Sequence, residues 1–149
     1  LLGCYDVNLL ETLAKALKLT GVQRGMVING NGMDEISIFG STKVSELLAD
    51  GSIKNYELTN KDFGITGNYT QNDLLGGTPE ENAATARLIL SGKGNDAHNA
   101  VISANVSAML HLAGKTESFK DGFEIAMDAV KSGRGIKKLD AISKITSEA

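Results

Sequence analysis

Two adjacent carboxylates, Asp34 and Glu35, are the residues of this chain whose types and spacing best suit chemistry. They follow an apolar run, Met26-Val27-Ile28, and a glycine-rich turn, Gly30-Asn31-Gly32. Neighbouring carboxylates in a loop after a strand are suitable ligands for a hard cation such as Mg²⁺. With 18 acidic residues in 149, about two adjacent acidic pairs are expected by chance. The position of the pair, rather than its existence, therefore carries the metal hypothesis.

The second acidic pair, Glu80-Glu81, has a sufficient local explanation. Thr78 is a typical N-cap, Pro79 suits the first helical position, and Glu81 completes a capping box. Negative charge at a helix N-terminus is also favoured by the helix dipole. We therefore predict a helix over about 79–91 and no metal role for this second pair.

Two glycine-containing segments invite a phosphate-binding interpretation. Gly30–Gly32 lacks the third glycine of a dinucleotide fingerprint, and the carboxylates after it would repel a bare phosphate. A divalent ion would neutralise both partners, which favours a metal-bridged pyrophosphate over a dinucleotide. The segment 92–95, with Lys93, could present N–H groups to an anion. A helix end followed by the next helix cap is the favoured interpretation of that segment.

The remaining reactive side chains form no recognisable catalytic arrangement. His98 and His111 lack a ligand partner three or four residues away, so each is expected to be a surface or helix-interface imidazole. Cys4 is the only cysteine, which excludes an intrachain disulfide and a multi-cysteine zinc site. No convincing general acid–base pair is visible.

Length, charge and hydropathy limit the class of protein. A chain of 149 residues fits one domain, and its net charge of −3 argues against binding to nucleic acid or an anionic membrane. The most apolar stretch, 101–113, is too short and too interrupted to cross a bilayer. With a single cysteine and no signal segment, a cytoplasmic location is expected. The apolar start at Leu1 suggests a chain trimmed from a longer one.

Periodicity and turn residues predict an α/β fold with a helix-rich C-terminal half. We expect strands over 22–29, 42–48 and 53–58, a short extended piece over 36–39, and an irregular polar segment over 60–77. The last two strands flank Asp50-Gly51, a typical hairpin turn, although 42–48 also fits a helical turn. Helices are expected over 7–19, 79–91, 96–113, 118–132 and 136–145. Asp6 is expected to cap the first of them. The helix over 96–113, capped by Asp96, is expected to be the central buried one.

Several runs together resemble one enzyme family, anthranilate phosphoribosyltransferase, in the version of enteric-type bacteria. They are Gly3-Cys4-Tyr5-Asp6, the run from Val27 to Ser37, Tyr56-Glu57-Leu58-Thr59, Asp62-Phe63-Gly64-Ile65 and the run from Gly76 to Asn82. The match is collinear over essentially all 149 residues, which makes it far more specific than any single motif.

The resemblance implies transfer of a phosphoribosyl group from phosphoribosyl pyrophosphate to anthranilate, with Mg²⁺, in tryptophan biosynthesis. It assigns Mg²⁺ binding to Asp34 and Glu35 and names no other catalytic residue. It also implies that residues 1–149 are the C-terminal part of the large α/β domain of the nucleoside phosphorylase/phosphoribosyltransferase-like, class-III-type fold. The central sheet would then be incomplete, and strand 22–29 would have an unpaired neighbour or an exposed edge.

The family's other functional segments have no counterpart in these residues. The Gly-Thr-Gly-Gly-Asp loop, the Lys-His-Gly-Asn segment and the N-terminal helical domain with its homodimer interface would precede Leu1. The chain is therefore expected to be inactive alone. Association with a glutamine-amidotransferase or anthranilate synthase stays open, as do a related transferase with another acceptor, a pyrimidine nucleoside phosphorylase and a non-catalytic binding module of the same fold.

Overall fold

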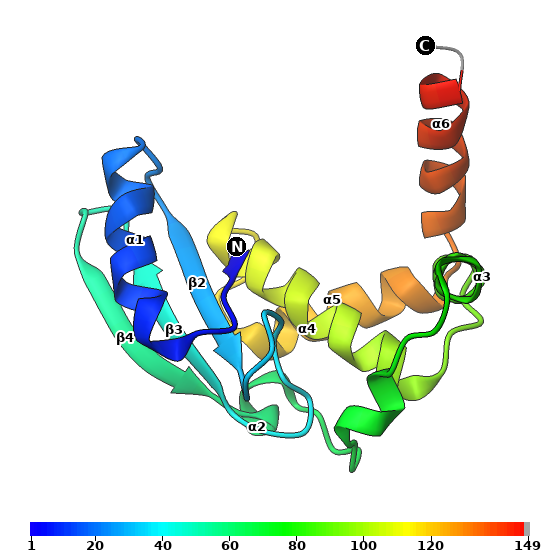
Figure 1. The fold of residues 1–149 in the computed structure, drawn as a ribbon, viewed down its shortest axis with the longest axis horizontal. Helices are drawn as coiled ribbons and strands as arrows, with labels where there is room; N and C mark the ends of the chain where they lie inside the picture. Colours follow the sequence, from blue (N-terminus) through cyan, green and yellow to red (C-terminus); the bar gives the residue numbers. More distant parts are fainter. Residues whose placement is uncertain (148–149) are drawn as a thin grey trace.

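A four-stranded mixed sheet organises the N-terminal half of the chain in the computed structural model, which describes residues 1–147 (Figure 1). The strands are β1 (Leu2–Gly3), β2 (Gly25–Gly30), β3 (Thr42–Leu47) and β4 (Ile53–Leu58). The α-helices are α1 (Leu10–Leu19), α2 (Asn60–Phe63), α3 (Pro79–Leu90), α4 (Asp96–Leu112), α5 (Phe119–Lys131) and α6 (Gly135–Ser147). Two short 3-10 helices, η1 (Val7–Leu9) and η2 (Gln71–Leu74), complete the list. The predicted α/β class and the helix-rich C-terminal half are confirmed.

The β3–β4 hairpin forms where the sequence places it. Thr42 pairs with Leu58 at the open end, and Gly51 adopts a positive φ of 82° in the turn. A glycine readily adopts this left-handed conformation, which closes the tight connection. Of the two interpretations of 42–48, the strand is therefore confirmed and the helical turn is wrong.

The sheet is completed by a strand that sequence patterns did not indicate. β1 runs parallel to β2, pairing Leu2 with Val27 and Gly3 with Ile28. β2 therefore lies inside the sheet, and the outer strands are β1 and β4. β1 covers only Val27 and Ile28 of the six residues of β2 and, among residues 1–147, has no strand on its other side, so the expected unpaired neighbour of strand 22–29 is β1. β2 also begins at Gly25, three residues later than predicted.

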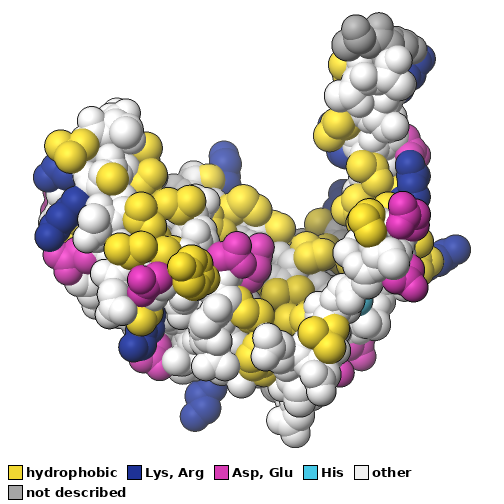
Figure 2. Space-filling model, in the orientation of Figure 1, with side chains coloured by type: hydrophobic (Ala, Val, Ile, Leu, Met, Phe, Trp, Pro, Cys, Tyr) yellow, Lys and Arg dark blue, Asp and Glu magenta, His cyan; other side chains and the backbone are white. Residues whose placement is uncertain are grey.

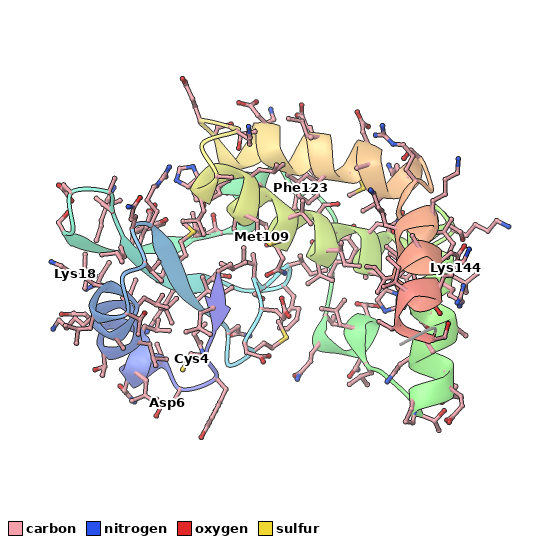
Figure 3. All side chains as sticks on the ribbon, turned by 90° about the horizontal axis from the view of Figure 1, so that it is seen from above. Cys4, Asp6, Lys18, Met109, Phe123 and Lys144 are labelled. Carbon is pink, nitrogen blue, oxygen red and sulfur yellow. The ribbon has the colours of Figure 1, made fainter. Side chains whose placement is uncertain are left out.

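The two faces of the sheet bury different side chains, because alternate residues of a strand point to opposite faces. On the α1 face lies a small cluster of Cys4, Leu10, Ala14 and Val27. Figure 3 shows Cys4 between β1 and α1, so this thiol is a buried small hydrophobe. The larger core lies between the sheet and α4, and includes Met26, Ile28, Ile36, Ile38, Val44, Leu58, Phe63, Ala100, Ala104 and Ala108.

Small residues let α4 serve as the buried central helix. Its buried face consists of Ala97, Asn99, Ala100, Ser103, Ala104, Ser107 and Ala108. A Cβ atom at Gly122 of α5 would lie only 3.1 Å from Ser107 Cα, so the two helices approach closely. The Ser107 hydroxyl donates to the Phe119 carbonyl at 2.6 Å. The predicted central position of this helix is confirmed.

Several local predictions need correction. Segment 60–77 contains α2 and η2, because Thr59 with Asp62 and Thr70 with Asp73 form capping boxes that start short helices. Segment 36–39 joins no strand, although Ile36 and Ile38 are buried. α4 is capped by Asn95 instead of Asp96, with the Asn95 side chain accepting from His98 N.

The last helix, α6, stands apart from the sheet at the far end of the molecule (Figure 1). It contacts α3, where Arg87 and Asp140 form an exposed ion pair at 3.1 Å. Figure 2 shows a hollow between α6 and the sheet half, with hydrophobic side chains over its floor. Among residues 1–147, no helix combines the length and apolar character needed to cross a membrane.

Candidate metal centre

The loop that carries Asp34 and Glu35 begins at the carboxyl end of β2, beside the carboxyl end of β1. A tight turn reverses the chain after β2: Gly30 N donates to Met33 O at 2.9 Å, and Met33 N donates back to Gly30 O at 3.2 Å. Asn31 and Gly32 occupy left-handed conformations with φ of 56° and 87°. In α/β proteins, the carboxyl ends of parallel strands are where ligands bind. The turn therefore places the carboxylate pair at this edge.

Two glycines allow the backbone of the acidic pair to lie directly on β1 and β2. A methyl group at Gly3 would overlap the carbonyl oxygen of Asp34. A methyl group at Gly30 would overlap the carbonyl oxygen of Glu35. Any larger residue at either position would push the loop away from the strands. The position of the pair thus depends on close packing of backbone against backbone.

The two carboxylates carry negative charge that the fold does not neutralise. Both residues are exposed, and among residues 1–147 neither carboxylate receives a hydrogen bond or an ion pair. Partial burial of its carboxyl group raises the pKa of Glu35, and the neighbouring Asp34 charge raises it further. Glu35 as a whole is solvent-accessible, so the burial concerns the carboxyl end beside the cavity described next. A divalent cation would relieve this repulsion.

A cavity of about 370 Å³ opens next to Glu35. It is lined by Met33, Glu35, Leu74, His98, Val101, Ile102 and Asn105. The wall is mainly apolar and comes from half-buried residues of α4 together with Met33 and Leu74, which explains how the Glu35 carboxyl group is desolvated. His98 thus lies on the same cavity as Glu35, a neighbour that spacing alone did not predict.

His111 lies elsewhere, in a polar cluster buried between α4 and the sheet. Its Nε2 is 3.7 Å from Glu46 Oε1, and its ring packs against Phe119 in a tilted arrangement with centroids 4.7 Å apart. The Tyr56 hydroxyl donates to Glu46 Oε2 at 2.9 Å. Burial, the hydrogen bond and the Glu46 charge all raise the pKa of Tyr56. The predicted helix-interface location of His111 is confirmed.

The segment 92–95 is a helix boundary, as favoured from sequence. Gly92 has a φ of 79°, and its N–H donates to Ile89 O at the end of α3. The Asn95 side chain accepts from His98 N at 2.8 Å at the start of α4. Both ends are explained by helix capping, so this segment offers no further anion site.

Sequence patterns did not single out two amides that contact the carboxylate loop. Asn29 Oδ1 accepts from Gly32 N at 3.1 Å, and Asn105 Oδ1 accepts from Ile36 N at 3.2 Å. Asn29 lies in the run from Val27 to Ser37 and Asn105 in Ala104-Asn105-Val106, both part of the family resemblance, but neither amide was assigned a role from the sequence. The one signal for Asn29 is a polar residue that ends an apolar strand, whereas Asn105 reaches the loop only through the tertiary fold.

The donor set fits Mg²⁺ as one part of a larger coordination shell. Within residues 1–147, no group of three or more His, Cys, Asp and Glu side chains is arranged to hold a metal ion. Mg²⁺ usually keeps several waters and uses one or two carboxylates together with substrate phosphates. Asp34 and Glu35 suit that kind of site, and water and phosphate oxygens would complete it.

The family comparison matches almost the whole chain. Residues 1–136 match the model of the glycosyl transferase family, a/b domain. The chain belongs to this glycosyl transferase family. Among curated members, the anthranilate phosphoribosyltransferase of Shewanella sp. (strain MR-4) is 40% identical over 149 residues, which is 100% of this chain and 42% of that protein. The chain therefore spans about two fifths of the length of the curated relatives that it matches.

Solved structures of the glycosyl transferase family share this fold. Anthranilate phosphoribosyltransferase from Thermus thermophilus aligns with a TM-score of 0.82 and 32% identity, covering 93% of this chain and 40% of that one. A variant from Saccharomyces cerevisiae with Mg bound aligns with a TM-score of 0.78 and 26% identity, covering 93% and 40%. The resemblance of the sequence to anthranilate phosphoribosyltransferase and the predicted fold class are confirmed.

Proposed function

We propose that the protein containing this chain transfers a phosphoribosyl group from phosphoribosyl pyrophosphate to anthranilate, and that Asp34 and Glu35 bind the Mg²⁺ used in this reaction. The observation that carries the proposal is an uncompensated carboxylate pair at the carboxyl ends of β1 and β2. It lies in a chain 40% identical to a curated enzyme of that name. The Mg-bound relative from yeast supports the choice of cation.

The chemistry requires neutralisation of a leaving group more than proton transfer to it. The anthranilate nitrogen forms a bond to C1 of the ribose, the bond from C1 to the pyrophosphate oxygen breaks, and pyrophosphate leaves with the electron pair. The attacking amine then loses a proton to solvent. When bound, Mg²⁺ would offset the charge on pyrophosphate. Asp34 and Glu35 would hold the ion, while the packing of their backbone on Gly3 and Gly30 keeps them at the strand ends.

We also propose that residues 1–149 form the C-terminal part of the α/β domain, and that the remainder of the protein supplies the phosphoribosyl and anthranilate contacts. The share of relatives that the chain covers, 42%, supports this division. The family resemblance supports homodimerisation through an N-terminal helical domain, and the single cysteine supports a cytoplasmic location. Association with a glutamine-amidotransferase domain is a further expectation from the resemblance alone.

The test is an assay of the full-length protein with phosphoribosyl pyrophosphate and anthranilate. We expect Mg²⁺-dependent loss of anthranilate fluorescence together with release of pyrophosphate, and negligible turnover by residues 1–149 alone. Turnover with a different aromatic amine, or phosphorolysis of a pyrimidine nucleoside, would instead support a related enzyme of the same fold. Absence of any turnover and of Mg²⁺ binding would indicate a non-catalytic module.

A further inference from the structure

We propose that the side-chain amides of Asn29 and Asn105 are positioning residues that fix the Asp34–Glu35 pair for metal binding. This inference rests on the proposed function, because it concerns the same loop. Each amide accepts a hydrogen bond from a loop N–H group, one before the acidic pair and one after it. The two residues come from different elements, β2 and α4, so the loop is held from both ends.

Asn29 joins the loop to the segment that follows β1. The residue is only 6% exposed, and the three hydrogen bonds of its side chain use both the oxygen and the nitrogen of the amide. Oδ1 accepts from Gly32 N at 3.1 Å, while Nδ2 donates to Cys4 O at 2.9 Å and to Tyr5 O at 2.8 Å. This one side chain therefore fixes the segment that follows β1 relative to the segment that follows β2.

Asn105 joins the other end of the loop to the central helix. Its Oδ1 accepts from Ile36 N, the residue directly after Glu35, at 3.2 Å. Its Nδ2 donates to Val101 O at 2.9 Å, which fixes the orientation of the amide along α4. Asn105 also lines the cavity beside Glu35. The loop position is thereby tied to the most buried helix of the molecule.

A neutral amide suits this task better than a charged group. A carboxylate at either position would add to the repulsion between Asp34 and Glu35, and a cation would compete with the metal. Ordering a flexible loop residue costs conformational entropy. Hydrogen bonds that order the loop before the ion arrives remove part of that cost from the binding step.

The experiment compares three alanine variants of the full-length protein: Asn29→Ala, Asn105→Ala and, as a matched control, Asn99→Ala. Asn99 lies on α4 like Asn105 and is buried like Asn29, but its Nδ2 donates to Gly94 O at 3.0 Å in a different loop. Amide hydrogen exchange reports the ordering directly. We expect faster exchange at Gly32 in Asn29→Ala and at Ile36 in Asn105→Ala, with both unchanged in Asn99→Ala.

Metal binding is measured by Mn²⁺ titration in the presence of inorganic pyrophosphate, with the protein-bound Mn²⁺ obtained by equilibrium dialysis, in which the Mn²⁺–pyrophosphate complex distributes equally across the membrane. We expect roughly ten-fold weaker binding for Asn29→Ala and Asn105→Ala, as for other residues that orient metal ligands, and unchanged binding for Asn99→Ala. The apparent KM for Mg²⁺ should rise more than kcat falls at saturating metal. A general loss of stability would not produce this pattern.

Equal Mn²⁺ affinities in the wild type and both loop variants would overturn the positioning role while leaving the metal site intact. A wild-type protein that binds no Mn²⁺ with pyrophosphate would overturn the metal site and this inference together. If Asn29→Ala does not fold, Asn105→Ala decides by the same criterion, because its half-buried side chain can be removed with less disturbance.

Discussion

The two adjacent acidic pairs of this chain follow glycine-rich turns and look alike in sequence, yet they lie in opposite environments. Glu81 is used by the fold: its Oε2 accepts from Thr78 N at 2.8 Å, and Thr78 Oγ1 accepts from Glu81 N at 3.3 Å at the start of α3. Among residues 1–147, nothing neutralises Asp34 or Glu35, and partial burial together with the Asp34 charge raises the pKa of Glu35.

This contrast separates a structural carboxylate pair from one that is available for a ligand. Carboxylates that accept backbone hydrogen bonds at a helix start stabilise the fold locally. A pair held at the end of parallel strands without such partners is electrostatically unfavourable, and the fold retains it with two glycines and two asparagine amides. The unfavourable pair is therefore the better candidate for function.

The largest effect is predicted for removing the charges of the first pair. Asp34→Asn with Glu35→Gln in the full-length protein should lower Mg²⁺-dependent turnover by about 100-fold or more, because the charge that holds the cation is lost. The thermal midpoint should stay the same or rise, since two repelling charges disappear. Steady-state kinetics at varied Mg²⁺ and a melting curve measure both quantities.

The matched control is Glu80→Gln with Glu81→Gln. It removes the same charge from the other pair, and should leave turnover unchanged while lowering stability by about 1 kcal/mol through the weakened helix start. Equal kinetic effects of the two double variants would remove the distinction between the pairs.

A smaller effect is predicted when a methyl group is added beside each pair. Gly3→Ala places a Cβ on the carbonyl oxygen of Asp34, so the loop or β1 must move, which should cost about 1–3 kcal/mol and weaken Mg²⁺ binding. Gly77→Ala meets mainly the carboxylate end of Glu81, which can turn aside without moving the backbone but weakens its hydrogen bond from Thr78 N. Its cost should stay below about 1 kcal/mol.

Denaturant unfolding gives the two stabilities, and Mn²⁺ titration gives the metal affinities. The distinction between the two acidic pairs would be wrong if Gly77→Ala weakened Mn²⁺ binding as much as Gly3→Ala does, because the second pair would then influence the metal site. Gly3→Ala with wild-type stability and affinity would show that the backbone contact with Asp34 does not set the loop position.

The smallest effect concerns a third carboxylate, Glu46, which is buried and structural. Tyr56→Phe removes the hydroxyl that donates to Glu46 Oε2, and should destabilise the protein by about 1 kcal/mol near neutral pH. Burial first, and then the hydrogen bond and charge of Glu46, raise the pKa of Tyr56 above its ordinary value of 10.0. The folded state therefore holds this proton more tightly than the unfolded state.

The sign of the pH dependence follows from that difference. The contribution of Tyr56 to stability is complete below pH 10.0 and falls as the pH rises above it, because only the unfolded chain then releases the proton. The stability gap between wild type and Tyr56→Phe should therefore narrow between about pH 8 and about pH 11. Urea unfolding of both proteins at the two pH values measures this difference in stability, and an unchanged difference would contradict the prediction.

Sequence patterns predicted the elements whose signals are local. The hairpin around Asp50-Gly51, the capped start of α3 and the amphipathic α5 depend on turn chemistry, caps and helical periodicity. Short helices with their own capping boxes were missed within 60–77, because four residues are too few for periodicity to register. β1 was missed for the same reason, since two residues carry no alternating pattern.

The candidate site likewise has a part that could be predicted from the sequence and a part that could not. The pair Asp34-Glu35 and its glycine-rich turn were identified from residue types and chain position. The contacts that tie the pair to β1 and α4 involve residues far apart in the sequence, such as the bond from Ile36 N to Asn105, 69 positions away, and such contacts follow from packing instead of local preference. The position of His98 beside the Glu35 cavity belongs to the same class.

The sequence of residues was sufficient for the hairpin turn, the capped start of α3, the acidic pair and the family resemblance, because each depends on neighbours within a few positions or on similarity along the whole chain. Tertiary structure was needed to show that, among residues 1–147, the first pair has no neutralising partner. That environment arises from β1 lying beside β2, and from α4 placing an apolar wall and an amide against the loop. Burial and electrostatic environment are properties of the packed molecule, so chain spacing alone does not determine them.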